Sequence, residues 1–144
     1  MSTANHETKR RTSSGEPLTH AEAVRIGQAY VDAYNARDLE AMLRLQDAEI
    51  ESFPSRLFEN RGHRGHAGVR AWWAEMEASG RWYEVRTRDV RVLAPDRAAV
   101  LGAIWDRGEL LSPWGVIFRV CDGLIVESHS YLSDEDLLAE LDLL

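Results

Sequence analysis

The chain has little of what a disulfide-bonded, membrane-spanning or nucleic-acid-binding protein needs. It contains one cysteine, Cys121, which excludes an internal disulfide. No apolar run approaches the ~18 residues of a membrane span, and the first residues lack the apolar segment of a secretion signal. The formal charge of -7 argues against a nucleic-acid or anionic-membrane partner, since both attract clustered basic residues. We therefore expect a cytoplasmic protein.

The length of 144 residues, with 44% hydrophobic residues, suits one globular domain with a buried core. Residues 1–17 are polar and rich in Ser, Thr and charge, so they cannot bury enough surface to offset the entropy lost on ordering. The sequence thus predicts a flexible tail at 1–17 and a single domain at 18–144.

Capping residues and apolar spacing predict three helices in the first half of the domain. The pattern T-H-A-E at Thr19 is a helix start, and the apolar stripe that follows contains Tyr30. Asp38 can cap a second, shorter helix. The stretch VRAWWAEMEASG predicts a third helix that stops at Gly80.

Beyond Gly80 the apolar period changes from helical to alternating. One short strand, EIESF, is expected before the third helix. Four more strands are expected after the third helix: WYEVRTRDVRVL, RAAVLGAIWDRG, LLSPWGVIFRVC and LIVESHSYL. Their short connections imply an antiparallel meander. The last segment, residues 133–144, begins with a capping serine and acidic residues, and predicts a terminal helix.

Helices on one face of a long antiparallel sheet define an α+β layer fold. The order of elements from Thr19 to Leu144 resembles the nuclear transport factor 2-like superfamily, in particular its SnoaL-like branch. The segments AYNARDLEAML, RGHAGVRAWW and DGLIVESHSYL carry this resemblance. It implies a curved sheet wrapped round the helices into a cone. The open end of such a cone is a ligand pocket, and its outer sheet face often pairs two subunits.

Alternation along each strand predicts which side chains face the interior. In the last strand the more apolar face carries Ser128 and Ser130, which leaves His129 on the outside. In LLSPWGVIFRVC the stronger apolar face is inward. The residues of that strand expected to face inward include Trp114, Val116 and Phe118.

The strand RAAVLGAIWDRG is apolar on both faces, so it should be covered twice. We assign Leu101 and Trp105 to the interior. The opposite face then points outward, and it predicts a homodimer through the outer sheet face, because no helix covers this patch. The patch consists of Val100, Gly102, Ile104 and Ile117.

The predicted interior therefore contains several aromatic rings below Tyr30. Two readings stay open: a packed aromatic core, or a pocket for a ligand. The candidate ligand-binding residues are Ser52, Trp73, Leu101, Trp105, Trp114, Val116, Phe118, Ser128 and Ser130.

The resemblance also gives Tyr30 a possible role. Ketosteroid isomerase relatives carry their oxyanion-stabilising tyrosine at this place. Their general-base aspartate corresponds to Ser52 and their protonated aspartic acid to Val116, so the chain lacks both carboxyl groups. SnoaL polyketide cyclases have an acid-base aspartate where this chain has Ser130, and the carboxylate set of limonene epoxide hydrolases cannot be completed.

His129 is the remaining titratable candidate for a catalytic base, since the pKa of histidine lies near neutrality. His63 and His66 lack the further ligands of a metal site, so we predict neither metal nor cofactor. Three functions stay open. The chain is a cofactor-independent isomerase, cyclase or lyase that uses Tyr30 and His129, a binding protein for an apolar or ring-containing metabolite, or an association domain with a filled core.

Overall fold

The computed structural model describes residues 17–53, 62–80 and 82–133 and confirms the α+β class. Its helices and strands are α2 (His20–Ala36), α3 (Leu39–Arg44), β1 (Gln46–Phe53), β2 (His63–Arg64), α4 (Gly65–Ser79), β3 (Glu84–Ala94), β4 (Arg97–Asp106), β5 (Glu109–Cys121) and β6 (Leu124–Tyr131). The predicted terminal helix, and the predicted tail apart from Pro17, lie outside the described residues.

The helix ends follow the capping residues that the sequence offers. The Thr19 hydroxyl accepts a hydrogen bond from the backbone N–H of Glu22 at 3.1 Å, which satisfies one free amide at the start of α2. The Asp38 carboxylate does the same for the N–H of Ala41 at the start of α3. Helix α4 ends at Gly80, whose φ of 67° is accessible to glycine at little cost. These three predicted boundaries are confirmed.

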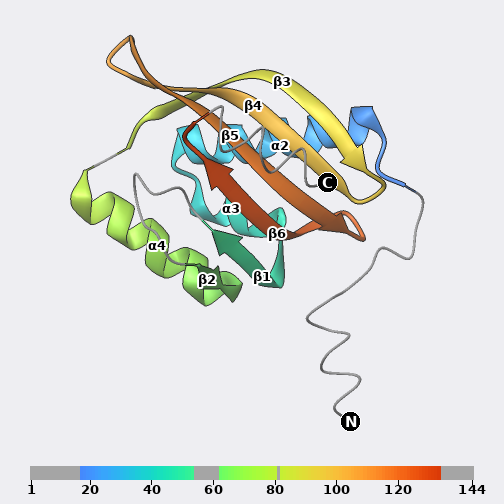
Figure 1. Ribbon diagram of the computed structural model, residues 1–144. Coiled ribbons are helices and arrows are strands. Elements are labelled where there is room, and N and C mark those ends of the chain that lie inside the picture. The colour runs from blue at the N-terminus through green and yellow to red at the C-terminus, as the bar shows by residue number, and fades with distance from the viewer. Residues whose placement is uncertain (1–16, 54–61, 81, 134–144) are drawn as a thin grey trace.

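Six strands form one sheet in the order β2-β1-β6-β5-β4-β3. The meander from β3 to β6 is antiparallel, as predicted, whereas β1 joins β6 in parallel. The sheet is curved and unclosed, and Figure 1 shows α2 behind its long strands and α4 beside β1 and β2. The helices thus cover the concave side of the sheet, which is the arrangement of the nuclear transport factor 2-like cone.

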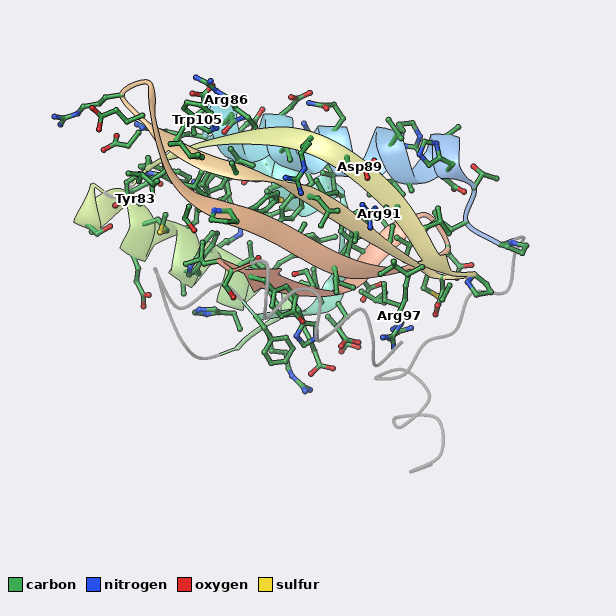
Figure 2. The ribbon with its side chains drawn as sticks, turned by 45° about the horizontal axis from the view of Figure 1, so that its top comes forward. Tyr83, Arg86, Asp89, Arg91, Arg97 and Trp105 are labelled. Carbon is green, nitrogen blue, oxygen red and sulfur yellow. The ribbon has the colours of Figure 1, made fainter. Side chains whose placement is uncertain are left out.

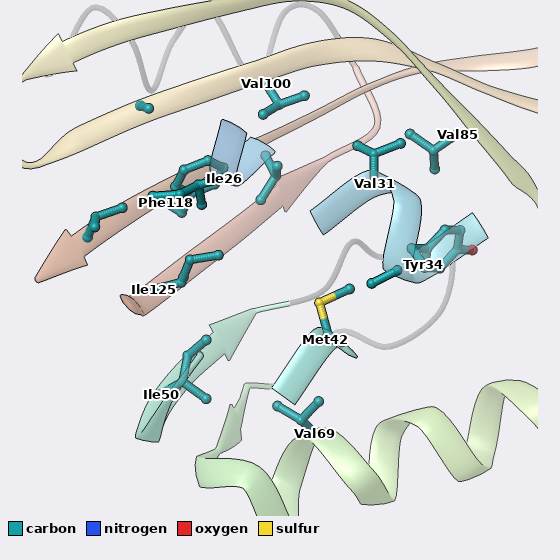
Figure 3. Close-up of a cluster of buried hydrophobic side chains, with 14 of the residues drawn as sticks. Ile26, Val31, Tyr34, Met42, Ile50, Val69, Val85, Val100, Phe118 and Ile125 are labelled. Atoms are coloured by element: carbon teal, nitrogen blue, oxygen red, sulfur yellow. The ribbon is translucent and has the colours of Figure 1, made fainter. Parts of the chain in front are cut away.

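The main core fills the space between the sheet and the helices. Ile26 on α2, Val100 on β4 and Phe118 on β5 are at most 1% exposed, and Figure 3 shows them gathered on this side. Helix α2 lies very close to β4, because a Cβ on Gly27 would stand 2.7 Å from a Val100 methyl group. Glycine at this position therefore allows the helix to approach the sheet.

The predicted sidedness of β4 is wrong. Val100 and Ile104 belong to the main core, whereas Leu101 packs in a second cluster and Trp105 is in neither. Register explains the error: Val100 lies opposite Val116 on β5, and directly opposed residues share a face of the sheet. The inward face of β5 therefore determines which face of β4 is inward. The prediction placed Leu101 and Trp105 inside, but Val100 and Ile104 occupy that face.

Gly102 lies on the same inner face of β4, so its predicted outward position is wrong too. A Cβ there would collide with the backbone carbonyl oxygen of Arg86 on β3. The neighbouring strand thus approaches more closely than any other residue would permit. Of the four residues expected in the outer patch, the structure places only Ile117 outside.

The outer face of the sheet carries its own small apolar cluster. Ala99, Leu101 and Ile117 form it, with Leu93 and Tyr131 packed at its rim. The three central residues are at most 5% exposed, so they offer little apolar area to another subunit. A homodimer through this face stays a prediction, and its contacts would have to come from the rim.

Candidate functional site

A pocket opens between the concave side of the sheet and the three helices. Described residues from all three helices and from five strands line it. They are Tyr30, Val31 and Tyr34 of α2, Met42 of α3, Gln46 and Ser52 of β1, Val69 and Trp72 of α4, Val85 of β3, Ile104 of β4, Trp114 of β5 and Ser130 of β6. Tyr30 is thus among the side chains that line a pocket on the concave side of the sheet.

The hollow is narrow inside and open at its mouth. Counted with the solvent-filled mouth, its empty volume is about 620 Å³, but the centre of a water molecule can reach only about 40 Å³. The smaller volume measures the room inside, because the larger volume includes open solvent. At roughly 10 to 15 Å³ per water on this measure, the inner space holds about three water molecules. A ring-sized ligand therefore requires side chains to move.

Tyr30 lies where the sequence placed it, in the interior stripe of α2. Its ring packs on Phe118 with 6.4 Å between the ring centroids, and its hydroxyl lies next to the side chain of Ser130. Burial raises the pKa of Tyr30 to about 12, and the neighbouring Ser130 side chain opposes part of that shift. The phenol is therefore neutral at physiological pH and is able to donate.

Two further hydroxyl groups meet beside the pocket. The Ser128 hydroxyl donates to the Ser52 hydroxyl at 3.3 Å, across the parallel pair of β1 and β6. Ser52 lines the pocket, while Ser128 is 2% exposed and lies behind it. Of the predicted ligand-binding residues, Ser52, Trp114 and Ser130 reach the pocket wall.

The other predicted residues of the inner face are buried outside the pocket lining. Val116 and Phe118 are fully buried core residues. Trp73 is 2% exposed and packs edge-on against Trp82, with 4.9 Å between centroids. Its neighbour Trp72 lines the pocket instead, because consecutive helix residues point in different directions.

Leu101 and Trp105, predicted to line the interior, face away from it. The guanidinium of Arg86 lies 4.0 Å from the centre of the Trp105 ring, a cation–π contact that Figure 2 shows on β3 and β4. Trp105 also borders a polar surface depression together with Arg37 and Arg107. Neither Leu101 nor Trp105 is among the residues that line the pocket.

His129 lies on the outer face of β6, as the alternation predicts, and does not line the pocket. Its ring stacks on Phe53 with 4.4 Å between centroids, and its Nε2–H donates to Glu127 at 2.8 Å. That hydrogen bond, together with the charges of His129 and Arg119, lowers the pKa of Glu127 to about 2 against burial. The position gives His129 no contact with a molecule in the pocket.

Tyr34 and Gln46 are the pocket residues that sequence reasoning missed and that carry polar groups. Burial raises the pKa of Tyr34 to about 12. The backbone of Tyr83 lowers that pKa, but the geometry falls short of a hydrogen bond, so the Tyr34 hydroxyl has no partner among the described residues. Tyr34 follows Tyr30 by one helical turn, a spacing that could have identified it.

The described residues that line the pocket include no Asp, Glu, His, Lys or Arg. Among the described residues no three His, Cys, Asp or Glu side chains come together as a metal site. His66 has a structural contact instead, since its Nε2–H donates to the backbone carbonyl of Gln46 at 3.0 Å. The pocket thus offers hydroxyl, amide, aromatic and aliphatic groups.

This fold is that of a known class. The sequence profile of the SnoaL-like domain matches residues 28–128, more than half of the chain, so the chain belongs to the SnoaL-like domain family. A comparison with curated protein sequences gives no match.

Solved structures share the fold at low sequence identity. A SnoaL-like protein from Burkholderia thailandensis is 23% identical, with a TM-score of 0.67 over 82% of this chain and 99% of that one. TerC, co-crystallized with polyporic acid, is 16% identical, with a TM-score of 0.65 over 84% and 98%. Rv0760c from Mycobacterium tuberculosis, in complex with estradiol-17beta-hemisuccinate, is 18% identical, with a TM-score of 0.62 over 79% and 95%.

None of the helices that the structure describes is long and apolar enough to cross a membrane.

Proposed function

We propose that this chain binds an uncharged, ring-containing small molecule in the pocket next to Tyr30. One observation carries the proposal: aromatic and aliphatic walls enclose a few buried polar groups, and no charged side chain is among the described lining residues. Apolar walls hold a ring by removing it from water, and placed polar groups orient it. A charged ligand would lose its hydration without gaining a counter-charge from these residues.

The structural neighbours support a binding role. TerC is crystallised with polyporic acid, and Rv0760c with estradiol-17beta-hemisuccinate. Both share the fold over most of this chain, so a hollow on the concave side of the sheet is a reasonable place for a small molecule here too. Their low identity carries no information on which molecule this chain takes.

Binding accounts for the pocket better than acid-base catalysis does. Moving a proton at neutral pH needs a group that ionises near that pH. Burial raises the pKa of both pocket tyrosines to about 12, and the remaining described lining residues are serine, glutamine, tryptophan and aliphatic side chains. Tyr30 is suited to hydrogen-bond a carbonyl or hydroxyl oxygen of the ligand, which is an orienting role.

Entrance of a ligand requires the pocket to widen. The inner space holds about three water molecules, which is less room than a ring takes, so side chains at the wall must rotate. Met42 suits this, because an unbranched thioether changes rotamer at low cost. Figure 3 shows Met42 between α2 and α4, near Tyr34 and Val69. The proposal therefore expects a ligand to order or displace this side chain.

Calorimetric titration with a matched pair of probes tests the proposal. The neutral 2-naphthol should bind, and the anionic 2-naphthoate should bind at least about tenfold more weakly, because its charge is not matched in the pocket. Val31→Phe should block 2-naphthol by filling the wall, whereas Val92→Phe, on an exposed position of β3, should not. Equal affinity for the two probes, or binding that survives Val31→Phe in a folded variant, would overturn the proposal.

A further inference from the structure

Gln46 is the most buried polar side chain of the pocket, and its backbone is held from two sides. It is the first residue of β1 and is 5% exposed. Its carbonyl accepts the hydrogen bond from His66 on α4, and the carbonyl of the preceding Leu45 accepts one from the N–H of Ile125 at 2.8 Å. The main chain of Gln46 is thus held in place, and its side chain is among those that line the pocket.

The side-chain amide of Gln46 has no hydrogen-bond partner among the described residues. Its Oε1 is fully buried, and none of the hydrogen bonds of the described residues involves either end of the amide. A buried amide oxygen without a partner destabilises the folded chain, because it has given up its hydrogen bonds to water. Glutamine at this place is therefore costly for the empty protein, unless something that enters the pocket completes its hydrogen bonds.

The chemistry of an amide defines its best partner. An amide presents an acceptor oxygen and donor N–H groups side by side, so a ligand with an adjacent donor and acceptor can engage both at once. The neutral hydroxyl of Tyr34, also without a hydrogen-bond partner among the described residues, lines the same pocket and adds a further donor. Such a partner must be uncharged, because the described lining residues include no charged side chain that could balance its charge.

We infer that Gln46 is the specificity-determining residue of the pocket, and that it selects an uncharged ring compound whose ring carries a hydrogen-bond donor next to an acceptor, as a lactam does. The inference rests on the proposed function and names the class of ligand. Aromatic and aliphatic walls would hold the ring, while the amide would read its polar edge. The hydroxyls of Tyr30 and Ser130 lie next to each other, whereas the Oε1 of Gln46 is buried without a partner among the described residues.

The first test uses the protein without any ligand. Gln46→Met keeps the length of the side chain and removes the amide, so the melting temperature should stay the same or rise. The control is Gln28→Met on the exposed side of α2, where Gln28 hydrogen-bonds Asp32. A melting temperature that falls clearly more for Gln46→Met than for the control would mean that the amide has a partner within the protein, and would overturn the inference.

The second test compares two neutral probes, 2-quinolinone and 1-methyl-2-quinolinone, by calorimetric titration. The methyl group removes only the ring N–H donor. For each protein the measured quantity is the ratio of its affinity for 2-quinolinone to its affinity for the methylated probe. This ratio should be about tenfold larger in the native protein than in Gln46→Met. Gln28→Met should give the same ratio as the native protein. The comparison between variants removes the effect of the methyl group's size, since both proteins meet the same two probes.

The outcomes separate this inference from the proposed function. If Gln46→Met retains the full preference for 2-quinolinone, the inference is wrong while the pocket still binds neutral rings. If the native protein binds neither probe and 2-naphthol also fails to bind, the proposed function falls and the inference falls with it. If the preference disappears in Gln46→Met and binding of the methylated probe is unchanged, Gln46 is the selecting group.

Discussion

The side chain of Asn35 bonds the backbone of Val85 at both of its polar groups. Its Nδ2–H donates to the Val85 carbonyl at 2.8 Å, and its Oδ1 accepts from the Val85 N–H at 2.9 Å. The Asn35 amide thus makes the two hydrogen bonds that a neighbouring strand would make with Val85 of β3, which is fifty positions away in sequence. Tyr34 and Val85, which line the pocket, are held in place by this contact between α2 and the sheet.

Asn35→Ala should therefore lower the free energy of unfolding by about 2 kcal/mol, since it removes two hydrogen bonds and leaves two part-buried backbone groups without partners. Urea unfolding measures this. Gln28→Ala, which removes an exposed side-chain hydrogen bond on the same helix, should cost less than about 0.5 kcal/mol. If the two variants lose similar free energies of unfolding, the contact between Asn35 and Val85 stabilises the fold no more than an exposed hydrogen bond does.

Local signals in the sequence were sufficient for the helix ends and for the antiparallel meander. Thr19, Asp38 and Gly80 mark helix ends by chemistry that acts within one turn, and the structure uses each of them. Alternation likewise predicted the four strands of the meander. The parallel pairing of β1 with β6 was not predicted, because no local residue pattern records which distant strand becomes a neighbour.

The site was predicted in part for the same reason. Tyr30 and Ser130 follow from helical and strand periodicity, but the side of β4 that faces inward depends on its register with β5. Irregular pairing between Ile104 and Trp105 changes that register locally, and short bulges leave no reliable trace in sequence. Gln46 was missed because a glutamine next to a turn is usually exposed.

Acid should weaken the fold through Glu127. Its pKa is lowered from an ordinary 4.5 to about 2, so its stabilising contribution is present above pH 4.5 and is lost as the pH falls toward 2. The side chain is one third exposed, and solvent screening reduces the contribution to about 1 kcal/mol. Glu127→Gln should lower stability by this amount at pH 6 and by much less at pH 2, whereas Glu49→Gln should show no such difference. Denaturant unfolding at both pH values checks it.

Ketosteroid isomerisation should be absent. The positions that correspond to the two functional carboxyl groups are Ser52, which lines the pocket, and Val116, which is buried behind it. Neither side chain is able to accept a proton from carbon at neutral pH. An absorbance assay with an unsaturated ketosteroid should give the background rate. Turnover well above background would require a base outside the described lining residues.

A two-fold dimer through the outer sheet face should depend on the rim of the outer cluster rather than on its centre. Leu93 and Tyr131 are partly exposed there, whereas Leu101 and Ile117 are almost completely buried. Light scattering at micromolar concentration should show a dimer that Leu93→Glu weakens, because a charge would then be buried at the contact. A monomer at this concentration would end the prediction.

Alkaline pH and a pair of substitutions test whether the neighbouring hydroxyls of Tyr30 and Ser130 stabilise each other. Because burial raises the pKa of Tyr30 from 10.0 to about 12, its contribution to stability is complete below pH 10 and is lost as the pH rises to 12, at a cost of about 2 to 3 kcal/mol. Tyr30→Phe should abolish this part of the alkaline loss. At neutral pH, Tyr30→Phe and Ser130→Ala should each lower stability by about 0.5 to 1.5 kcal/mol, and the double variant should lose little more than either single one. Strictly additive losses would show that the two hydroxyls do not stabilise each other.

Calorimetric titration of Tyr30→Phe with 2-naphthol gives the second readout, in which the loss of the phenol as a partner for the ligand hydroxyl should weaken binding about threefold to tenfold.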